Sequence, residues 1–471
     1  MRRRVPDQPR SDVPGRTSVG TGSTASSSPR PCGRPRRSIA GDGGEGRCAW
    51  HLRSLNLATL ANVARGTNQT PAGRVDAAAV DPSPRTVLTR RPRRSWLVAL
   101  TLGFLLGTGA HARVWAEQAT ATTAPGDGWK RAAPGRAIVL PADHVAHPEY
   151  RLEWWYYTGN VQGDDGRPYG YQVTFFRFGV VREQANASAW AVRDLYMAHV
   201  AVTDPEGRGH LFADRINRAG VHWAGARTDR YEVWNETWRV SLDAQGRHHL
   251  QVDADEFSLD LRLEEGKRAA LQGADGYSQK GTDPGNASHY YSLTRMPTTG
   301  TIRVGEKTVG VSGASWMDHE FGTSALEAST QGWDWFALQL SDGRELMLYR
   351  FRRTDGQPDP YSSGTWVAVD GSTVDLDASA FVITPKREWR SKQSGATYPV
   401  EWDVSIPGSE TTIRVRAVAD QQELMTRRST NVTYWEGAVT VDGQSGGKPV
   451  TGRGYVELTG YAGRAISEVM R

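Results

Sequence analysis

The chain has 471 residues, two of them Cys, and a formal net charge of +5, and its length suggests two or three domains. The first 112 residues carry the positive charge, with 18 Arg, no Lys and 6 Asp or Glu, whereas the other 39 Lys or Arg and 46 Asp or Glu give residues 113–471 a balance of −7. Because this larger part is acidic and has no long basic stripe, we expect no nucleic-acid partner.

Cys32 and Cys48 both precede residue 113. The rest of the chain therefore has no disulfide framework, no thiolate metal site and no Cys nucleophile. It does contain 15 of the 17 Trp, and each aromatic side chain can bury on the order of 150–250 Å². This composition predicts a large aromatic core, an aromatic-lined cavity, or both.

The N-terminal residues read as an export leader. Residues 1–87, rich in Arg, Ser, Pro and Gly, are predicted to be disordered, or to be an extension upstream of the true translation start. In residues 88–112, Arg90 and the following arginines precede an apolar run at 96–107 and the small residues of Ala110-His111-Ala112, which is the pattern of a signal peptide. We expect cleavage near Ala112 and a periplasmic or secreted protein, with an uncleaved anchor as the alternative.

Short alternating apolar runs follow a predicted linker at 113–146. Gly, Asn and Asp clusters separate them, a pattern typical of an antiparallel sandwich or barrel. The predicted strands include 169–181, 333–340, 346–352, 365–369, 399–406, 411–418, 433–441 and 454–459, with one short helix at 377–381. Residues 147–320 and 321–471 are each long enough for a barrel of about eight strands that can hold a small ligand. We therefore predict an all-β protein of two tandem antiparallel barrels.

Several catalytic signatures are absent from the sequence. It has no Gly-Xaa-Ser-Xaa-Gly elbow, no phosphate loop, no dinucleotide fingerprint and no His-Glu-Xaa-Xaa-His. The sequence thus argues against a conventional serine hydrolase or a nucleotide-dependent enzyme.

The densest group of reactive side chains lies in residues 315–322. On a strand, Asp318 and Glu320 share a face with Trp316, whereas His319 points to the other face, so Asp318, His319 and Glu320 cannot bind one metal together. Two carboxyl groups in one aromatic cavity would raise the pKa of one of them and make it a proton donor near neutral pH. The alternative is that both cap a turn or pair with Arg.

Two aromatic runs contain weaker candidates. His289 and Tyr291 share a face if 288–295 is a strand, although a His in such a strand is more often structural. Trp155 begins the first strand set, where packing at the closed end of a barrel is favoured over ligand binding.

The run at 332–337 adds three further candidates for ligand binding. Trp333 and Trp335 are expected near the junction of the two halves. Asp334 either pairs with Arg or faces the ligand, and the sequence leaves both options open.

Four aromatic motifs, at residues 153–156, 313–322, 332–336 and 434–437, resemble the lipocalin-like AttH / carotenoid 1,2-hydratase family, some members of which are described as predicted secreted hydrolases. The resemblance spans about residues 147–465. It implies two tandem lipocalin-like β-barrels without cofactor or metal. Family members include hydratases that add water to a terminal C=C of an acyclic carotenoid, exported AttH-type proteins associated with an ABC-transporter system, and fungal relatives similar to pericyclases.

The resemblance also implies a catalytic site. The hydratase motifs His-Xaa-Trp and Tyr-Xaa-Asp match residues 289–291 and 316–318, with the two aromatics exchanged. By this resemblance Asp318 is the acid that protonates the alkene, Tyr291 and Trp316 stabilise the carbocation, and His289 orients Asp318 or the attacking water.

We therefore expect an exported protein that binds an apolar or amphipathic small molecule, a lipid or isoprenoid, and that serves an AttH-type ABC-transporter system. The alternative is a cofactor-free hydratase or lyase acting on an isoprenoid. The mature form is expected to have no stable membrane span. The predicted ligand-binding residues are Trp155, Glu320, Trp333, Asp334 and Trp335.

Overall fold

The computed structural model describes residues 128–183, 187–188, 190–283, 285–323, 326–463 and 465. These residues form 23 strands in two antiparallel sheets and two short 3-10 helices, η1 (Ala142–His144) and η2 (Pro407–Ser409), so the all-β prediction is confirmed. Neither described helix has the length and apolar character needed to cross a membrane. The predicted extension at 1–87, the signal peptide at 88–112 and the first part of the linker lie outside the described residues.

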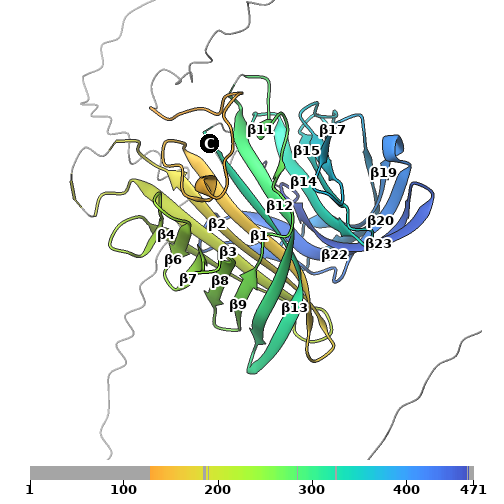
Figure 1. The fold of residues 1–471 in the computed structure, drawn as a ribbon, viewed down its shortest axis with the longest axis horizontal. Coiled ribbons are helices and arrows are strands. Elements are labelled where there is room, and N and C mark those ends of the chain that lie inside the picture. Colours follow the sequence, from red (N-terminus) through yellow and green to blue (C-terminus); the bar gives the residue numbers. More distant parts are fainter. Residues whose placement is uncertain are drawn as a thin grey trace, which may run out of the picture. The chain divides into compact units, whose positions relative to one another are not determined.

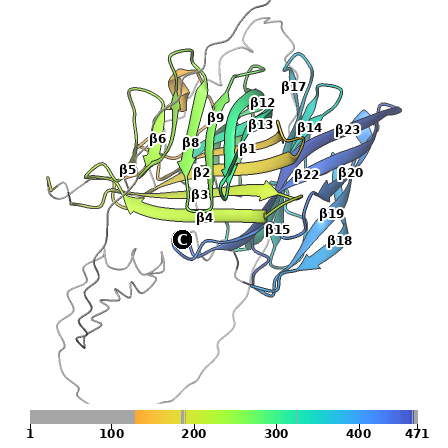
Figure 2. The same cartoon turned by 90° about the horizontal axis from the view of Figure 1, so that it is seen from below.

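Sheet A has 13 strands (Figure 1). They are β1 (Leu152–Gly163), β2 (Pro168–Gly179), β3 (Asp194–Asp204), β4 (Gly209–Arg218), β5 (Ala224–Ala226), β6 (Glu232–Asn235), β7 (Trp238–Leu242), β8 (His248–Asp253), β9 (Phe257–Leu263), β10 (Ala270–Leu271), β11 (Tyr277–Gln279), β12 (Ala287–Val304) and β13 (Lys307–Gly322). The order is β4-β3-β2-β1-β13-β12-β9-β8-β7-β6-β5, with β10 and β11 also paired to β12. Figure 2 shows β1 to β4 side by side.

Sheet A closes into a barrel where β3 and β4, at one end of the strand order, contact β5 and β6 at the other end. The Asn235 amide of β6 donates to the Tyr196 carbonyl oxygen of β3 over 3.0 Å, and the Asn217 amide of β4 donates to Oδ1 of Asn235 over 2.7 Å. The two Asn side chains thus supply hydrogen bonds between strands that are not joined by backbone pairing. Closure of this kind removes the exposed edges that an open sheet would present.

Sheet B has ten strands. They are β14 (Thr330–Leu340), β15 (Glu345–Arg353), β16 (Ser363–Val367), β17 (Thr373–Asp377), β18 (Val382–Arg390), β19 (Thr397–Ile406), β20 (Thr411–Ala417), β21 (Glu423–Met425), β22 (Thr433–Ser445) and β23 (Lys448–Leu458). The order is β17-β16-β15-β14-β23-β22-β20-β19-β18, with β21 paired to β22. Sheet B is a half-barrel, since its end strands β17 and β18 do not pair with each other.

Alternation along β1 separates two layers of aromatic side chains. Trp155 and Tyr157 lie in the barrel interior and are fully buried there. Trp154 and Tyr156 point to the outer face of sheet A, where they pack with residues of sheet B such as Trp335. A strand buried on both faces loses the usual apolar and polar alternation, which explains the unbroken aromatic run of β1.

Sheet B packs against the outer face of sheet A through β1, β2 and β12 (Figure 1). The Gln339 amide of β14 donates to the carbonyl oxygens of Thr294 (2.8 Å) and Ser315 (3.0 Å), and the Asn160 amide of β1 donates to the Gly454 carbonyl oxygen over 3.1 Å. Each of these bonds satisfies a polar group at the contact between the sheets, as burial requires.

The predicted strands of the second half correspond to β14, β15, β16, β19, β20, β22 and β23. The predicted helix at 377–381 is wrong. Strand β17 ends at Asp377, and the Asp377 carboxylate then accepts a hydrogen bond from the Ser379 backbone N–H over 2.8 Å. An Asp side chain that bonds the backbone two residues on favours a turn over a helix.

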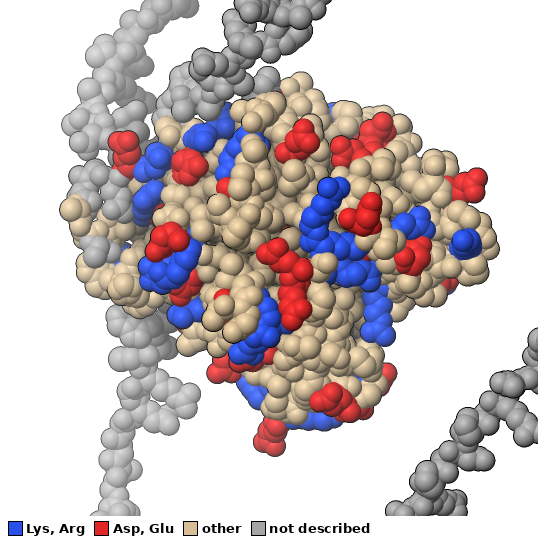
Figure 3. Space-filling model, in the orientation of Figure 1, with Lys and Arg blue, Asp and Glu red and all other residues tan. Residues whose placement is uncertain are grey.

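On the face drawn in Figure 3, acidic and basic side chains are interspersed, and no large area carries one sign of charge. The absence of a nucleic-acid partner stays a prediction.

Candidate active site between the two sheets

A cavity of about 180 Å³ lies between the outer face of sheet A and sheet B. Nine of its lining residues are aromatic, and four others carry a carboxyl group. The lining residues are Leu152, Trp154, Tyr156, Thr174, Phe176, Lys280, Asn286, Ala287, Ser288, Tyr290, Asp318, Glu320, Gly322, Leu326, Trp333, Trp335, Tyr349, Phe351, Tyr434, Glu436 and Glu457. An apolar pocket with a few converging polar groups is the usual form of a small-molecule site.

Asp318 on β13 lies at this cavity and is buried. Three neighbours donate hydrogen bonds to its carboxyl: the Tyr290 hydroxyl to Oδ2 (2.7 Å), and the Ser292 hydroxyl (2.5 Å) and the Trp316 indole N–H (2.7 Å) to Oδ1. Tyr290 and Ser292 are on β12, and Ser292 is directly opposite Asp318 in the register. The carboxyl is therefore held in one orientation by side chains of two strands.

Burial raises the pKa of Asp318 to about 7, and the charge of Glu320 adds to this effect, although the hydrogen bonds from Ser292, Tyr290 and Trp316 lower the pKa. A carboxyl with such a pKa is partly protonated near neutral pH. It can donate a proton in one state and accept one in the other.

Glu320 and Lys280 form the charged corner of the cavity. Lys280 Nζ lies 3.1 Å from Oε1 of Glu320, which also accepts a hydrogen bond from the Ser288 hydroxyl. The ammonium group is 4.6 Å from the ring centre of Tyr349. Burial lowers the pKa of Lys280, but the Glu320 carboxylate outweighs this and raises it, so Lys280 is the cation of a pocket rich in carboxyls.

Two more carboxyls enter from sheet B. Glu436 on β22 and Glu457 on β23 are directly opposite each other in the register. Burial raises the pKa of Glu436 well above its usual range, and the neighbouring Glu457 adds to the rise. Burial also raises the pKa of Glu457 to about 7, against the hydrogen bond from the Trp333 indole N–H at 3.0 Å. Carboxyls this close do not all ionise together.

Aromatic rings form the wall around Asp318. The rings of Tyr156 and Trp335 meet edge to face at 5.1 Å, and those of Trp316 and Trp335 at 6.3 Å. The Trp335 indole N–H donates to the Tyr290 hydroxyl over 3.3 Å. The electron-rich faces of such rings stabilise a nearby cation.

The structure brings together five of the predicted site residues: Asp318, Glu320, Trp316, Trp333 and Trp335. As expected from strand alternation, His319 points away from Asp318 and Glu320, into the barrel, where it lies 3.0 Å from Oε1 of Glu153.

His289 and Tyr291 do not lie with Asp318, so the expectation that all four catalytic candidates share one pocket is wrong. Both residues have the opposite parity on β12 and face the barrel side. His289 packs on Tyr150 and Phe321, and the Tyr291 hydroxyl is 2.6 Å from Nδ1 of His144. The tyrosine that contacts Asp318 is instead Tyr290, which lies between His289 and Tyr291 in the sequence and points to the other face of β12.

Two predicted ligand-binding residues lie elsewhere. Trp155 is in the barrel interior, where its indole N–H donates to the His144 carbonyl oxygen over 3.0 Å. Asp334 is fully buried and pairs with Arg350 (2.5 Å) and Arg352 (3.0 Å), so the salt-bridge option is the one observed. Neither residue lines the cavity.

Sequence reasoning missed Lys280, Tyr290, Ser292, Glu436 and Glu457. Tyr290 and Ser292 have the strand parity that puts them opposite Glu320 and Asp318, so the pairing of β12 with β13 would have found them. Lys280, Glu436 and Glu457 come from other elements, and no local pattern connects them to Asp318.

A family model described as AttH-like matches residues 131–461. The chain belongs to the AttH-like family. A crystal structure of an AttH protein from Nitrosomonas europaea is similar to it, with 34% identity and a TM-score of 0.64, over 70% of this chain and 99% of that one. The resemblance stated from the aromatic motifs is thereby confirmed, and with it the lipocalin-like fold.

This AttH-like chain is also similar to two curated fungal proteins. One is the dehydratase asqC of Emericella nidulans, 21% identical in an alignment of 225 residues that covers 46% of this chain and 63% of that protein. The other is the kievitone hydratase of Fusarium solani subsp. phaseoli, 22% identical in an alignment of 238 residues that covers 46% of this chain and 61% of that protein. The matches thus span just over three fifths of the curated relatives' length.

A crystal structure of kievitone hydratase from Nectria haematococca has a TM-score of 0.55 and 17% identity, over 71% of this chain and 96% of that one. At that identity the likeness shows the fold alone.

Proposed function

We propose that this AttH-like protein adds water to, or removes it from, an apolar small molecule bound between the two sheets, with Asp318 as the acid. The observation that carries the proposal is the state of Asp318: it is buried in an aromatic cavity, held by three donors, and has a pKa of about 7. A general acid works best when its pKa is near the operating pH.

The hydration step balances with the groups present. The π electron pair of a C=C bond takes the Asp318 proton, which leaves a carbocation on the second carbon and a carboxylate on Asp318. The rings of Trp335 and Tyr156 stabilise that cation. A water oxygen then forms the C–O bond, and its proton passes to a carboxylate of the cavity, with Glu457 as the candidate because its pKa is also about 7. Dehydration is the reverse sequence.

The names of relatives agree with this chemistry. The curated relatives are a dehydratase and a hydratase, two directions of one reaction class. The cavity itself favours an isoprenoid, because nine of its lining residues are aromatic.

A second candidate is a carrier of an apolar or amphipathic molecule that serves an ABC-transporter system. The aromatic lining of the cavity supports it, since such a lining binds a lipid or isoprenoid without chemistry. A carrier has no need of a proton donor, and three hydrogen bonds that orient a carboxyl with a pKa near 7 favour the enzyme. Export is a proposal derived from the leader sequence, and the transporter partner is a proposal derived from the family resemblance.

The test is a turnover assay in H₂¹⁸O. Purified protein is incubated with a panel of acyclic isoprenoids and of their tertiary alcohols, and products are analysed by mass spectrometry. The enzyme hypothesis predicts an ¹⁸O-labelled alcohol from an alkene, or an alkene from an alcohol. A carrier predicts stoichiometric binding, followed by Trp fluorescence, with no label in the bound molecule.

Two variants separate the hypotheses. Asp318→Asn keeps the size of the side chain but cannot donate a carboxyl proton. Glu306→Gln makes the same acid-to-amide change on the exposed turn between β12 and β13 and is the matched control. Label incorporation that is equal in wild type and in Asp318→Asn would reject Asp318 as the acid.

A further inference from the structure

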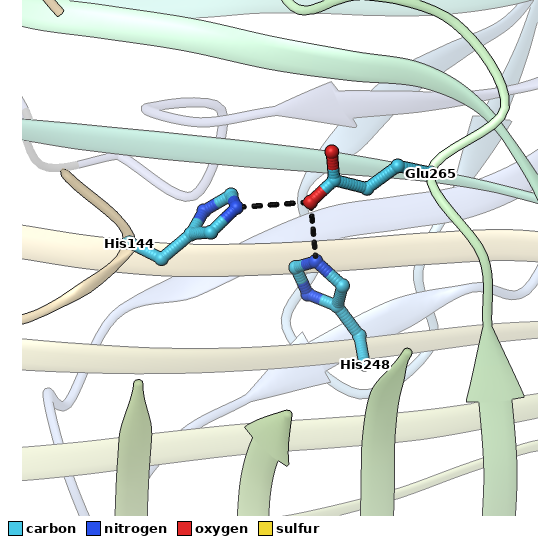
Figure 4. Close-up of side chains that lie close together, drawn as sticks. All are labelled: His144, His248 and Glu265. Atoms are coloured by element: carbon cyan, nitrogen blue, oxygen red, sulfur yellow. Dashed lines mark hydrogen bonds and ion pairs between the residues drawn. The ribbon is translucent and has the colours of Figure 1, made fainter. Parts of the chain in front are cut away.

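A second polar cluster lies at one end of the barrel, away from the cavity between the sheets. Two histidines, His144 of η1 and His248 of β8, point toward the same carboxylate oxygen (Figure 4). This oxygen belongs to Glu265, in the loop between β9 and β10. Oε1 of Glu265 is 3.1 Å from Nε2 of His144 and 3.5 Å from Nε2 of His248. Both imidazole side chains are fully buried, whereas the Glu265 side chain is 38% exposed.

The two imidazole rings are oriented by tyrosines. Nδ1 of His144 is 2.6 Å from the Tyr291 hydroxyl, and Nδ1 of His248 is 2.7 Å from the Tyr157 hydroxyl. Each ring therefore presents its Nε2 to Glu265. Nε2 of His248 is buried yet makes no hydrogen bond of good geometry. Histidines that bind metals typically have their second nitrogen fixed by such a partner.

The separations agree with metal coordination. With Zn–N and Zn–O bonds of about 2.0–2.2 Å, two ligand atoms of a tetrahedral site lie roughly 3.3 Å apart. The two nitrogen–oxygen distances in the cluster, 3.1 and 3.5 Å, lie on either side of that value, and all three donor atoms are within 4.8 Å of one another. Two His and one Glu are the ligand set of several zinc sites that keep one position for water.

A neighbouring cluster of two histidines and a glutamate is not suited to bind a metal cation. His147, Glu153 and His319 also gather their donor atoms within 4.8 Å. There, however, Nε of Arg177 lies 3.1 Å from Oε2 of Glu153, and the His147 backbone N–H donates to the same carboxylate. A buried guanidinium already supplies the positive charge, so a second cation would be repelled.

We propose that His144, His248 and Glu265 bind a divalent transition metal ion of the Zn²⁺ class, with water in the remaining position. The ion enters from the solvent side, where Glu265 is exposed. It connects η1, β8 and the β9–β10 loop, and that loop is already attached to sheet B because Lys267 pairs with Glu345 at 2.8 Å. The ion is a constituent of the barrel end and takes no part in the proposed chemistry at Asp318.

The test uses the full chain without an affinity tag of histidines, stripped of metal by a chelator. Zn²⁺ is titrated by calorimetry, and Co²⁺ by visible absorption, which is strong for a tetrahedral ion with nitrogen ligands and weak for a hydrated one. We expect one equivalent of Zn²⁺ and a tetrahedral Co²⁺ spectrum. Glu265→Gln should weaken Zn²⁺ binding at least tenfold.

The control is placed close to the site. Glu264→Gln alters the adjacent, exposed carboxylate and should leave Zn²⁺ affinity unchanged. His248→Gln is a second ligand variant and should lose the site as Glu265→Gln does. No stoichiometric Zn²⁺ binding by the wild type, or equal affinity in wild type and both ligand variants, would overturn the proposal.

Discussion

The Tyr290 hydroxyl donates a hydrogen bond of 2.7 Å to Oδ2 of Asp318 across strands β12 and β13. A phenol that donates to a buried carboxyl keeps it oriented toward the cavity, and burial at the same time raises the pKa of Asp318 to about 7. The hydrogen bonds thus set the orientation of the carboxyl and oppose the rise in its pKa, and burial outweighs them. The predictions below follow from this arrangement.

Asp318→Asn should lower turnover of an alkene or alcohol substrate by about 10²- to 10⁴-fold, the usual contribution of a general acid or base. Binding should stay within roughly tenfold, because the amide keeps the shape of the side chain. The measurements are single-turnover rates and Trp fluorescence titration of the same preparation. Loss of binding together with turnover would point to a damaged pocket.

Turnover in the hydration direction should fall as the pH rises through about 7, since only protonated Asp318 donates. The contribution of Asp318 to the free energy of unfolding should also fall as the pH rises. The folded-state pKa is raised above the unfolded value of about 3.9, so this group's stabilising contribution is complete below pH 4 and is lost as the pH rises through 7. Unfolding free energies measured from pH 4 to 8 should show a shallower pH dependence in Asp318→Asn than in wild type.

Lys280→Gln should shift the falling limb of the pH–rate profile to higher pH. Lys280 pairs with Glu320 beside Asp318, and its removal makes an ionised Asp318 less favourable, because opposite charges stabilise the charged form. Lys280→Arg retains the charge and should keep the wild-type limb. A limb that stays in place in Lys280→Gln, or moves to lower pH, would contradict this electrostatic account.

Arg177→Met should destabilise the barrel by about 3–5 kcal/mol, the usual effect of removing one member of a buried ion pair. Arg177 is 1% exposed and lies 3.1 Å from each of Glu153 and Asp194, which would both lose their buried guanidinium partner. Urea unfolding measures the loss. Ligand affinity of the folded fraction should be unchanged, because Arg177 does not line the cavity, and a change in affinity would mean that the barrel interior also shapes the site.

The sequence predicted the strands and the face of β13 well, because both depend on local alternation. Trp316, Asp318 and Glu320 have one parity, and a period of two fixes their common face. The same rule failed for His289 and Tyr291 because parity shows which residues share a face but not which face opposes Asp318. That depends on the β12–β13 register, where Ser292 is opposite Asp318 and the pairing shifts between Leu293 and Met296.

The two carboxyl groups that sheet B adds to the cavity could not be predicted from the sequence, for a different reason. Glu436 and Glu457 are more than 100 residues from Asp318 and reach the cavity only through the packing of one sheet on another. Asp334, by contrast, sits among site aromatics in sequence yet points to Arg350 and Arg352. Its neighbours Trp333 and Trp335 take the opposite parity and line the cavity.

The measurement that tests the central claim most directly is a titration of the Asp318 carboxyl itself. Protein labelled with ¹³C at the Asp side-chain carboxyl is followed by NMR from pH 4 to 9, and the Asp318→Asn variant assigns the signal. The account predicts an apparent pKa near 7 for that carboxyl. A pKa close to the ordinary Asp value of about 3.9 would mean that the group is ionised at neutral pH, and Asp318 could then not be the acid.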